Sequence, residues 1–334
     1  MILYKFTGII KEGEDRKEMR YNTLGNSGIK VSELCFGVLP MGPLQANMLA
    51  QEGAKIIRKG LDSGINFLDT AQAYKTYPHI REALVHFPKE VIIASKSHAT
   101  GYKEMKEAVL EACRELNRSY IDIFHLHAPQ EDKDVFQKRA GALSALVDLK
   151  KEGIIRAIGI STHAIEVVEK SAEIKEIDVV FPLINRIGLG IIGGKPVEMI
   201  QAIKKIFNNG KGVYAMKALA GGYLIKTIEE AITFVRKIKE IQSIAVGMVH
   251  SRELEINLKI FENQKINQEE FIKEEFSRKR LIVSRFCEGC GTCVKACPNQ
   301  ALSLRDGKAV VNYNLCLTCG YCVPHCPIFA LRIV

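Results

Sequence analysis

The sequence predicts an α/β protein in which a closed (β/α)₈ barrel is followed by a small, cysteine-rich α+β domain. Two observations lead to this fold class. Short apolar segments alternate with amphipathic segments over most of the chain, and one cysteine run occurs twice near its end. Apolar strands separated by amphipathic helices are typical of a parallel sheet with both faces covered. Eight such units are the number that closes a barrel.

The barrel elements follow one another in regular order from Val31 onward. The strands are expected at 31–37, 65–69, 90–96, 121–127, 156–160, 178–183, 212–217 and 243–247. Segments with helical periodicity separate them. The helix after the first strand ends at Gly64, a residue suited to a helix C-terminus, and a later one begins at Pro196, which is typical of a first turn. The other helices are expected at about 78–86, 105–116, up to 153, and at 164–174, 227–240 and 251–262.

The remaining segments divide the chain into further parts. Residues 1–22 alternate weakly around a turn at 11–15, which predicts a hairpin that caps the barrel. The barrel itself is expected to occupy 23–262. The polar segment 263–282 is interpreted as a linker, and 283–334 as the small domain.

The small domain contains the spacing C-x₂-C-x₂-C-x₃-C-P twice. The two runs consist of Cys287, Cys290, Cys293 and Cys297, and of Cys316, Cys319, Cys322 and Cys326. This spacing is typical of two [4Fe–4S] clusters, with the fourth cysteine of each run bound to the cluster of the other. The first cluster would then take Cys326 and the second Cys297. Zinc sites, which favour separate cysteine pairs, and disulfides are the alternatives. The domain resembles a bacterial-type two-cluster ferredoxin.

Composition narrows the class of protein. Hydrophobic residues make up 47% and charged residues 25% of the 334, which is ordinary for a soluble globular chain. No apolar run approaches the roughly 20 residues of a membrane span, and the first residues lack the form of a signal peptide. Cys35 and Cys113, outside the two runs, are expected in the core. Unpaired cysteines and oxygen-labile clusters together predict a reducing cytoplasm.

The formal charge of +9 is spread along the chain. There is no arginine stripe with interleaved aromatic residues, which argues against nucleic-acid binding. The small domain has more basic than acidic side chains: Arg285, Lys295, Arg305, Lys308 and Arg332 against Glu288 and Asp306. This excess would offset the charge of anionic clusters or help to bind an acidic redox partner, such as an external ferredoxin.

Polar residues at the ends of the expected strands form a candidate catalytic set. They are Asp69, Tyr74 just beyond it, Lys96 and His127. In a (β/α)₈ barrel, functional residues lie at the carboxyl ends of the strands. A tyrosine is a poor acid at neutral pH unless a nearby cation favours its ionised form, and Lys96 would supply that cation. Asp69 would hold Lys96 charged, and His127 would polarise a carbonyl while Tyr74 moves the proton.

Three segments carry a resemblance to a known family. The chain from Phe67 to Tyr74, the strand end Ala94-Ser-Lys96 and the segment from Ile121 to Pro129 resemble the aldo-keto reductase family, as does the opening from Leu24 to Gly37. The resemblance covers about 20–262. It implies a TIM barrel, the interconversion of a small carbonyl compound and its alcohol by hydride transfer, and the tetrad named above.

The resemblance also implies positions that bind a nicotinamide cofactor. These are Gly37, Ser161, Thr162, Asn185, Lys217, Gly221, Gly247, Met248, Ser251, Arg252 and Asn257. Lys217 and Gly221 would lie near the pyrophosphate. Gly247 and Glu253, however, stand where many members have a Lys and an Arg for the 2′-phosphate of NADP, and a glutamate repels that group. NADP(H), NAD(H) and a flavin such as FMN therefore all stay open.

Hydride transfer moves two electrons, whereas each cluster passes one. Three hypotheses follow. In the first, the barrel is a nicotinamide-dependent carbonyl or alcohol oxidoreductase, and the clusters serve a redox partner or a structural role. In the second, a flavin in the barrel converts between two-electron and one-electron steps, and the clusters connect it to an external ferredoxin. In the third, the protein is a non-catalytic redox sensor.

Overall fold

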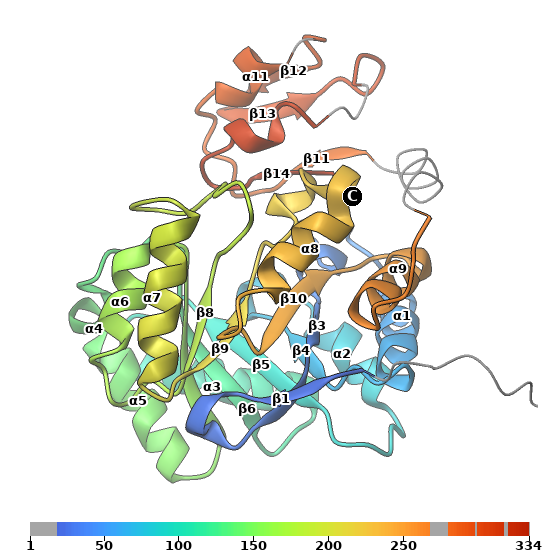
Figure 1. Ribbon diagram of the computed structural model, residues 1–334. Helices are drawn as coiled ribbons and strands as arrows, with labels where there is room; N and C mark the ends of the chain where they lie inside the picture. Colours follow the sequence, from blue (N-terminus) through green and yellow to red (C-terminus); the bar gives the residue numbers. More distant parts are fainter. Residues whose placement is uncertain (1–18, 268–279, 298, 317–319, 334) are drawn as a thin grey trace, which may run out of the picture.

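Eight parallel strands close into a barrel, which confirms the predicted fold class. The computed structural model describes residues 19–267, 280–297, 299–316 and 320–333. The ring order is β10-β3-β4-β5-β6-β7-β8-β9 (Figure 1). The strands are β3 Leu34–Gly37, β4 Phe67–Asp69, β5 Ile92–Ser97, β6 Ile121–Ala128, β7 Ile155–Thr162, β8 Val179–Pro182, β9 Gly212–Ala215 and β10 Ser243–Gly247.

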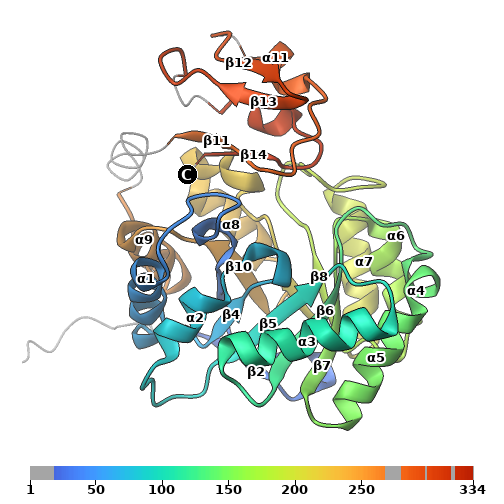
Figure 2. The same cartoon turned by 180° about the vertical axis from the view of Figure 1, so that it is seen from behind.

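Helices surround the ring on its outer side, as Figure 2 shows from behind. They are α1 Ala50–Asp62, α2 Tyr77–Leu84, α3 Tyr102–Leu116, α4 Val135–Lys138, α5 Ala140–Lys151, α6 Ile165–Ser171, α7 Pro196–Asn208, α8 Ile228–Arg236 and α9 Ser251–Phe261. The largest apolar cluster fills the layer between the strands and these helices. Burial of this layer is the main favourable contribution to folding of the barrel.

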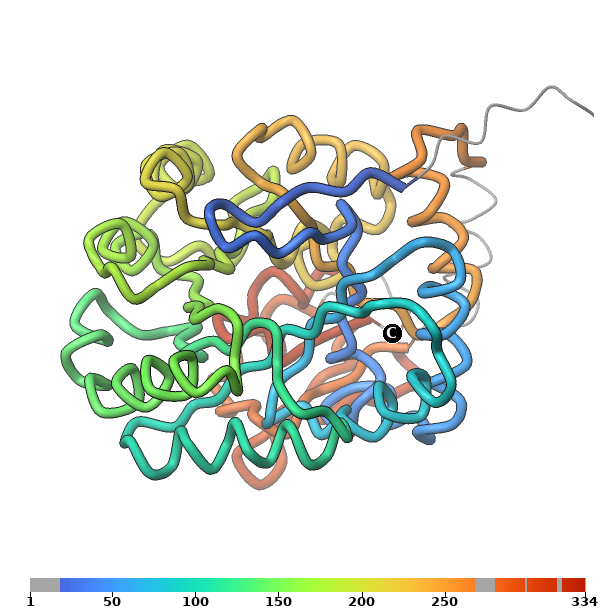
Figure 3. The backbone as a smooth tube through the Cα atoms, turned by 90° about the horizontal axis from the view of Figure 1, so that it is seen from below, coloured from blue at the N-terminus to red at the C-terminus, as the bar shows by residue number. Residues whose placement is uncertain are grey.

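A hairpin closes the amino-terminal end of the barrel. It pairs β1 Tyr21–Thr23 with β2 Lys30–Ser32. In Figure 3, which looks at the molecule from below, it is the blue segment on the near side. Its apolar side chains, Leu24 among them, join the cluster inside the barrel. The hairpin predicted around residues 11–15 lies outside the described residues. The predicted strand 31–37 is divided, since part of it belongs to this hairpin and part to β3.

The cysteine-rich tail lies over the carboxyl end of the barrel strands (Figures 1 and 2). It contains the antiparallel pairs β11 Leu281–Val283 with β14 Leu331–Ile333, and β12 Leu302–Arg305 with β13 Lys308–Val311. A short helix, α11 Thr292–Ala296, follows the first cysteines. Strand β14 packs against the turn η4 Ala220–Gly222 of the barrel. The tail therefore covers the end of the barrel at which functional residues are expected.

The structure describes both ends of the predicted linker 263–282 and shows where the flanking elements end and begin. Helix α9 ends at Phe261, and residues 263–267 have no regular structure. Strand β11 begins at Leu281, slightly before the predicted start of the tail domain. It belongs to the tail because it pairs with β14.

Candidate functional site

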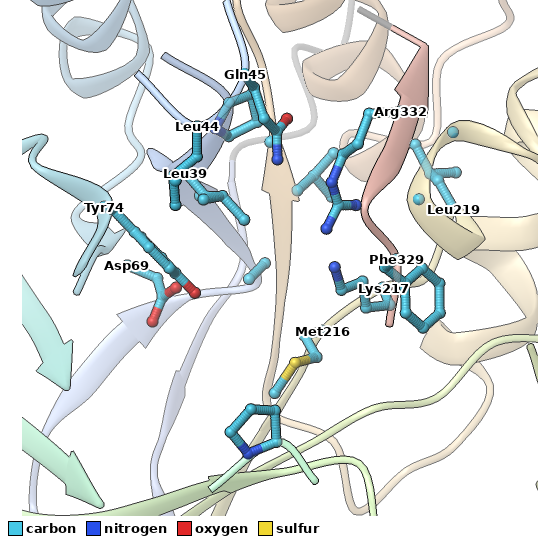
Figure 4. Close-up of a pocket in the computed structure, with 18 of the residues that line it drawn as sticks. Leu39, Leu44, Gln45, Asp69, Tyr74, Met216, Lys217, Leu219, Phe329 and Arg332 are labelled. Atoms are coloured by element: carbon cyan, nitrogen blue, oxygen red, sulfur yellow. The ribbon is translucent and has the colours of Figure 1, made fainter. Parts of the chain in front are cut away.

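A cavity of about 550 Å³ lies between the barrel and the tail. Its walls come from strand ends, from the loop that contains Leu39 and Leu44, and from the tail. Asp69 and Tyr74 lie on one side of it, and Lys217, Phe329 and Arg332 lie on the other (Figure 4). The cavity thus has a wall of predicted catalytic residues opposite a wall to which the tail contributes.

Asp69 and Lys96 form a buried ion pair at the strand ends. The Lys96 Nζ donates hydrogen bonds to both Asp69 carboxylate oxygens at 2.7 and 2.8 Å and to the Thr70 carbonyl at 2.7 Å. The pairing follows from strand register: Asp69 lies opposite Ala94, and Lys96 is two residues further on the same face. Burial has the largest influence and would lower the pKa of Lys96, but the Asp69 carboxylate, together with Tyr74 and Cys35, raises that pKa overall. Lys96 is therefore charged at neutral pH.

Tyr74 ends the short turn η3 Gln72–Tyr74 and extends over this ion pair. The Lys96 Nζ lies 4.9 Å from the centre of the Tyr74 ring. Burial raises the pKa of the Tyr74 hydroxyl, and the Lys96 charge opposes that rise. Tyr74 is thus a protonated phenol beside a fixed cation, which is the state required of a proton donor.

His127 completes the group of predicted catalytic residues around the cavity. Its ring lies edge-on to that of Tyr74 at 5.9 Å and stacks on the ring of His98 at 4.0 Å. Burial, together with the neighbouring His98 and Lys96, holds the pKa of His127 well below its ordinary value. A neutral imidazole in this position can donate a hydrogen bond to a carbonyl oxygen.

A second network supports Asp69 from inside the barrel. The Tyr214 hydroxyl donates to Asp69 Oδ2 at 3.0 Å and lies 2.7 Å from His125 Nε2. Gly159 leaves room for the His125 ring, since a Cβ at that position would overlap it. Tyr214 is not among the residues that the sequence analysis singled out. Tyr214 could have been found because it is the one phenol in the apolar strand 212–217. The alternation of side chains along that strand indicates that Tyr214 faces the inside of the barrel.

The predicted cofactor residues are only partly brought together. Gly37, Lys217, Gly221 and Gly247 line the cavity. The others do not: Ser161, Thr162, Asn185, Met248, Ser251, Arg252 and Asn257. Thr162 accepts a hydrogen bond from the Ala164 N–H through its Oγ1. The Asn185 side chain bonds the backbone of Leu189 through both its oxygen and its nitrogen. Their assignment to a cofactor stays a prediction.

Glu253 has a structural role at the start of α9. Its carboxylate accepts hydrogen bonds from the backbone N–H groups of Val249 at 2.6 Å and His250 at 3.1 Å. Free N–H groups at a helix N-terminus are a common binding site for phosphate. Here the protein's own carboxylate occupies two of the N–H groups at that end. Glu253 therefore caps the start of α9 from within the helix itself.

The cysteines of the tail lie around a small hollow. Cys287, Cys290, Cys293 and Cys326 line it together, which is the set predicted for the first cluster. The Ala309 and Ala330 N–H groups donate to the sulfurs of Cys287 and Cys326. Such N–H···S bonds tune cluster potentials. This donor set fits an iron–sulfur cluster.

The predicted second set is described only in part. The Ala301 N–H donates to the sulfur of Cys297, and Cys316 and Cys322 pack with it in the core of the tail. Cys319 lies outside the described residues. Within the part of the chain that the structure describes, no three His, Cys, Asp or Glu side chains gather as closely as the ligands of a single ion would.

Two protein-family models match the chain. The model for the "Aldo/keto reductase family" covers residues 33–272, and that for a "4Fe-4S dicluster domain" covers residues 279–327. Fold and site thus define a barrel oxidoreductase that carries an iron–sulfur domain. The chain belongs to the aldo/keto reductase family.

Individual relatives are distant. Methylglyoxal reductase DkgA of Escherichia coli is 29% identical over 193 residues, which cover 54% of this chain and 67% of that protein. L-galactose dehydrogenase of Arabidopsis thaliana is 26% identical over 62% of this chain and 67% of its own length. The structure of the aldo-keto reductase AKR11C1 from Bacillus halodurans covers 77% of this chain and 96% of its own, with a TM-score of 0.62 and 21% identity. That likeness shows the fold alone.

One further observation concerns membranes. Among the helices in the described ranges, none combines the length and the apolar character needed to cross a bilayer.

Proposed function

We propose that this protein interconverts a small carbonyl compound and its alcohol in the cavity between barrel and tail. The observation that carries the proposal is the arrangement of Tyr74 beside the charged Lys96, with Asp69 bonded to Lys96 by both oxygens. A nicotinamide, when bound, supplies or accepts the hydride. Methylglyoxal and simple aldoses are sensible first substrates, because the relatives named above are a methylglyoxal reductase and a sugar dehydrogenase.

Each side chain has a distinct task in this proposal. Tyr74 gives its hydroxyl proton to the carbonyl oxygen as the carbon is reduced, or takes it back during alcohol oxidation. Lys96 stabilises the phenolate left behind, since a nearby cation favours the ionised form. Asp69 keeps Lys96 charged and fixed in place. Neutral His127 donates a hydrogen bond to the same carbonyl oxygen and orients the substrate.

NADH is the favoured dinucleotide. The lining of the cavity includes the basic residue Lys217 and the glycines Gly221 and Gly247. Lys217 could bind the anionic part of a dinucleotide, and the glycines lack side chains that would keep it away from the backbone. Glu253, in contrast, puts a carboxylate in the segment that the family resemblance assigns to a 2′-phosphate, and it bonds two backbone N–H groups there. A carboxylate close to a phosphate is repulsive, whereas it is tolerated beside a free ribose hydroxyl.

The test is reduction of a panel of small carbonyl compounds, methylglyoxal included, by anaerobically prepared protein with both clusters loaded. Oxidation of NADH or NADPH is followed by absorbance. The proposal expects turnover with at least one compound, and a higher kcat/KM with NADH than with NADPH. Absence of turnover with both nucleotides across the panel would contradict it. Glu253→Gln serves as a probe of the preference, because it keeps the size of the side chain and removes its charge.

A flavin-dependent reaction is the second candidate, and one observation favours it. Glu288 and Ile328 line both the cavity and the hollow of the first cysteine set, so the two sites share a wall. Electrons exchanged one at a time across this wall require a partner that handles both one and two electrons, as a flavin does. An external ferredoxin would then supply the clusters. Absorbance and mass analysis of the cofactor released from anaerobically purified protein separates the candidates, because only this one expects a flavin.

A further inference from the structure

We propose that Lys217 of the barrel and Arg332 of the tail form one oxyanion-binding site, which holds a phosphate or carboxylate group of the ligand in the cavity. The site is incomplete without the tail, because Arg332 belongs to β14. The proposal concerns binding alone and does not require the reaction proposed above.

Both cations face the cavity. Arg332 reaches into it from β14 and is only 8% exposed, and its Nε has no hydrogen-bond partner among the residues that the structure describes. Lys217 follows β9 and points toward it from the barrel (Figure 4). Throughout the described ranges, neither side chain has an ion pair with a carboxylate. Arg332 is buried and Lys217 is half-buried. Because charges removed from water are normally paired, two such cations in one wall without an ion pair point to an anion that binds between them.

Phe329 holds the two cations on the same side of the cavity. Its ring centre lies 4.7 Å from the Lys217 Nζ and 5.9 Å from the Arg332 Cζ. The ring is fully buried against Gly190 and Gly221 of the barrel. A Cβ at Gly190 would overlap it, so this contact requires glycine there. The tail thus docks by a specific fit, which fixes the position of Arg332 three residues later.

The acids that line the cavity leave these cations uncompensated. Asp69 is bonded to Lys96, and Glu253 accepts backbone N–H groups of α9. Glu288 is exposed at the rim and has no ion pair with either cation. Burial, followed by the charge of Arg332, lowers the pKa of Lys217 well below its ordinary value. Burial likewise lowers the pKa of Arg332 to about 10. A bound anion would remove this electrostatic penalty.

A competing role for Arg332 is compensation of cluster charge. Its charge is close enough to Cys326 for the two to interact. Arg332 nevertheless lines the barrel cavity and not the hollow formed by the first cysteine set. The geometry therefore points to a ligand in the cavity as its main partner.

Calorimetric titration of the full chain, with clusters loaded and under anaerobic, low-salt conditions, tests the site. The probes are inorganic diphosphate, as the anionic part of a dinucleotide, and pyruvate, as a small anionic carbonyl compound. The variants are Lys217→Gln and Arg332→Gln. Their matched controls are Lys204→Gln in α7 and Arg305→Gln in β12, both exposed positions. Arg332→Lys keeps the charge but not the bidentate geometry.

The proposal expects at least one probe to bind, and each Gln variant to weaken that binding by on the order of tenfold to a hundredfold, as loss of a charge-assisted hydrogen bond does. Arg332→Lys should retain part of the affinity, and the controls should change it less than about twofold. Displacement of diphosphate by NADH assigns the site to a cofactor, whereas pyruvate binding in the presence of saturating NADH assigns it to a substrate.

Two outcomes overturn the proposal. One is that neither probe binds, or that binding is unchanged in both Gln variants. The other is that Arg332→Gln shifts a cluster reduction potential while probe affinity stays the same, which would make Arg332 a counter-ion of the cluster. Because no turnover is measured, a failure of the proposed reaction does not affect either reading.

Discussion

The barrel and the tail hold their candidate sites in place by different physical means. The barrel positions Asp69 and Lys96 at the ends of paired strands, and an extensive apolar layer fixes those strands. Among the described residues of the tail, the apolar core contains only ten buried residues, and three of them are cysteines. Small domains with little apolar core commonly depend on metal for stability. The barrel site is therefore built by the fold, whereas we expect the fold of the tail to depend on what its site binds.

Removal of iron is expected to have the largest effect and to separate the two regions. Without clusters, amide hydrogens of β11 to β14 should lose protection from exchange by on the order of a hundredfold or more, because metal-binding free energy becomes folding free energy. Amides of the barrel strands β5 and β6 should be nearly unchanged. Hydrogen exchange followed by mass spectrometry, on loaded and iron-free protein, measures both. Equal protection of the tail in the two samples would refute the difference between the regions.

Two buried aspartates separate catalysis from stability within the barrel. Asp69→Asn leaves Lys96 buried without its partner, which should cost about 3 kcal/mol or more of unfolding free energy. It should also lower kcat/KM by on the order of a hundredfold or more. Asp122 is fully buried too, but it pairs with Arg156 and accepts the Ile93 N–H away from the cavity.

Asp122→Asn is thus the matched control. It should lower stability by about 1–3 kcal/mol and change kcat/KM less than about twofold. Steady-state kinetics and urea unfolding of both variants give the comparison. Equal kinetic losses would mean that Asp69 acts through the fold alone.

Acid should destabilise the interface between the regions through His163. Its ring packs edge-on to Phe329, and burial beside Lys217 and Arg332 lowers its pKa to about 3. An ordinary histidine has a pKa of 6.5. As the pH falls below this value, His163 becomes protonated in the unfolded chain but stays neutral in the folded protein. Stability is therefore lost with falling pH in that window, by up to about 1.4 kcal/mol per pH unit.

The test compares urea unfolding at pH 7 and pH 5. His163→Asn should abolish about 2 kcal/mol of the loss seen in the unmodified protein. The exposed His86, changed to Asn, is the control and should leave the loss as it is. If His163→Asn does not reduce the acid sensitivity, the burial of neutral His163 is not what causes it.

Tyr214 should have the smallest effect, because its contact with the candidate catalytic residues is a single hydrogen bond to Asp69. Tyr214 does not line the cavity, so Tyr214→Phe should lower kcat by about twofold to tenfold, the equivalent of one hydrogen bond, with KM unchanged. Tyr77→Phe is the control, since it loses a bond of the same kind to Ser95 outside the cavity. A change confined to KM, or an equal effect of Tyr77→Phe, would rule out positioning of Asp69.

The sequence predicted that the candidate catalytic residues lie at one end of the barrel, because neighbouring parallel strands are held in a fixed register. Lys96 lies opposite His125, and His127 is two residues further, so local spacing places these side chains at one end of the barrel. The opposite wall could not be predicted in this way. Arg332 and Phe329 reach the cavity through docking of the tail, which no local pattern encodes. Phe329 even adopts a left-handed backbone conformation (φ 55°) that is uncommon for an aromatic residue.

Glu253 shows a different limit of sequence reasoning. Its substitution for an expected basic residue was visible, but its bonds to the N–H groups of Val249 and His250 depend on helix geometry. The sequence could show that the basic side chains expected to bind a phosphate are replaced. It could not show that the Glu253 carboxylate accepts hydrogen bonds from backbone N–H groups at the start of α9.

Carbonyl reduction by a Tyr74→Phe variant tests the central claim most directly. This change removes the proton donor and leaves the ring, the Asp69–Lys96 pair and the tail in place. With clusters loaded and the nucleotide saturating, the account predicts that kcat falls by on the order of a hundredfold to ten-thousandfold. Tyr102→Phe, at an exposed tyrosine, should keep full activity. Full turnover by Tyr74→Phe would contradict the assignment of Tyr74 and, with it, the proposed mechanism.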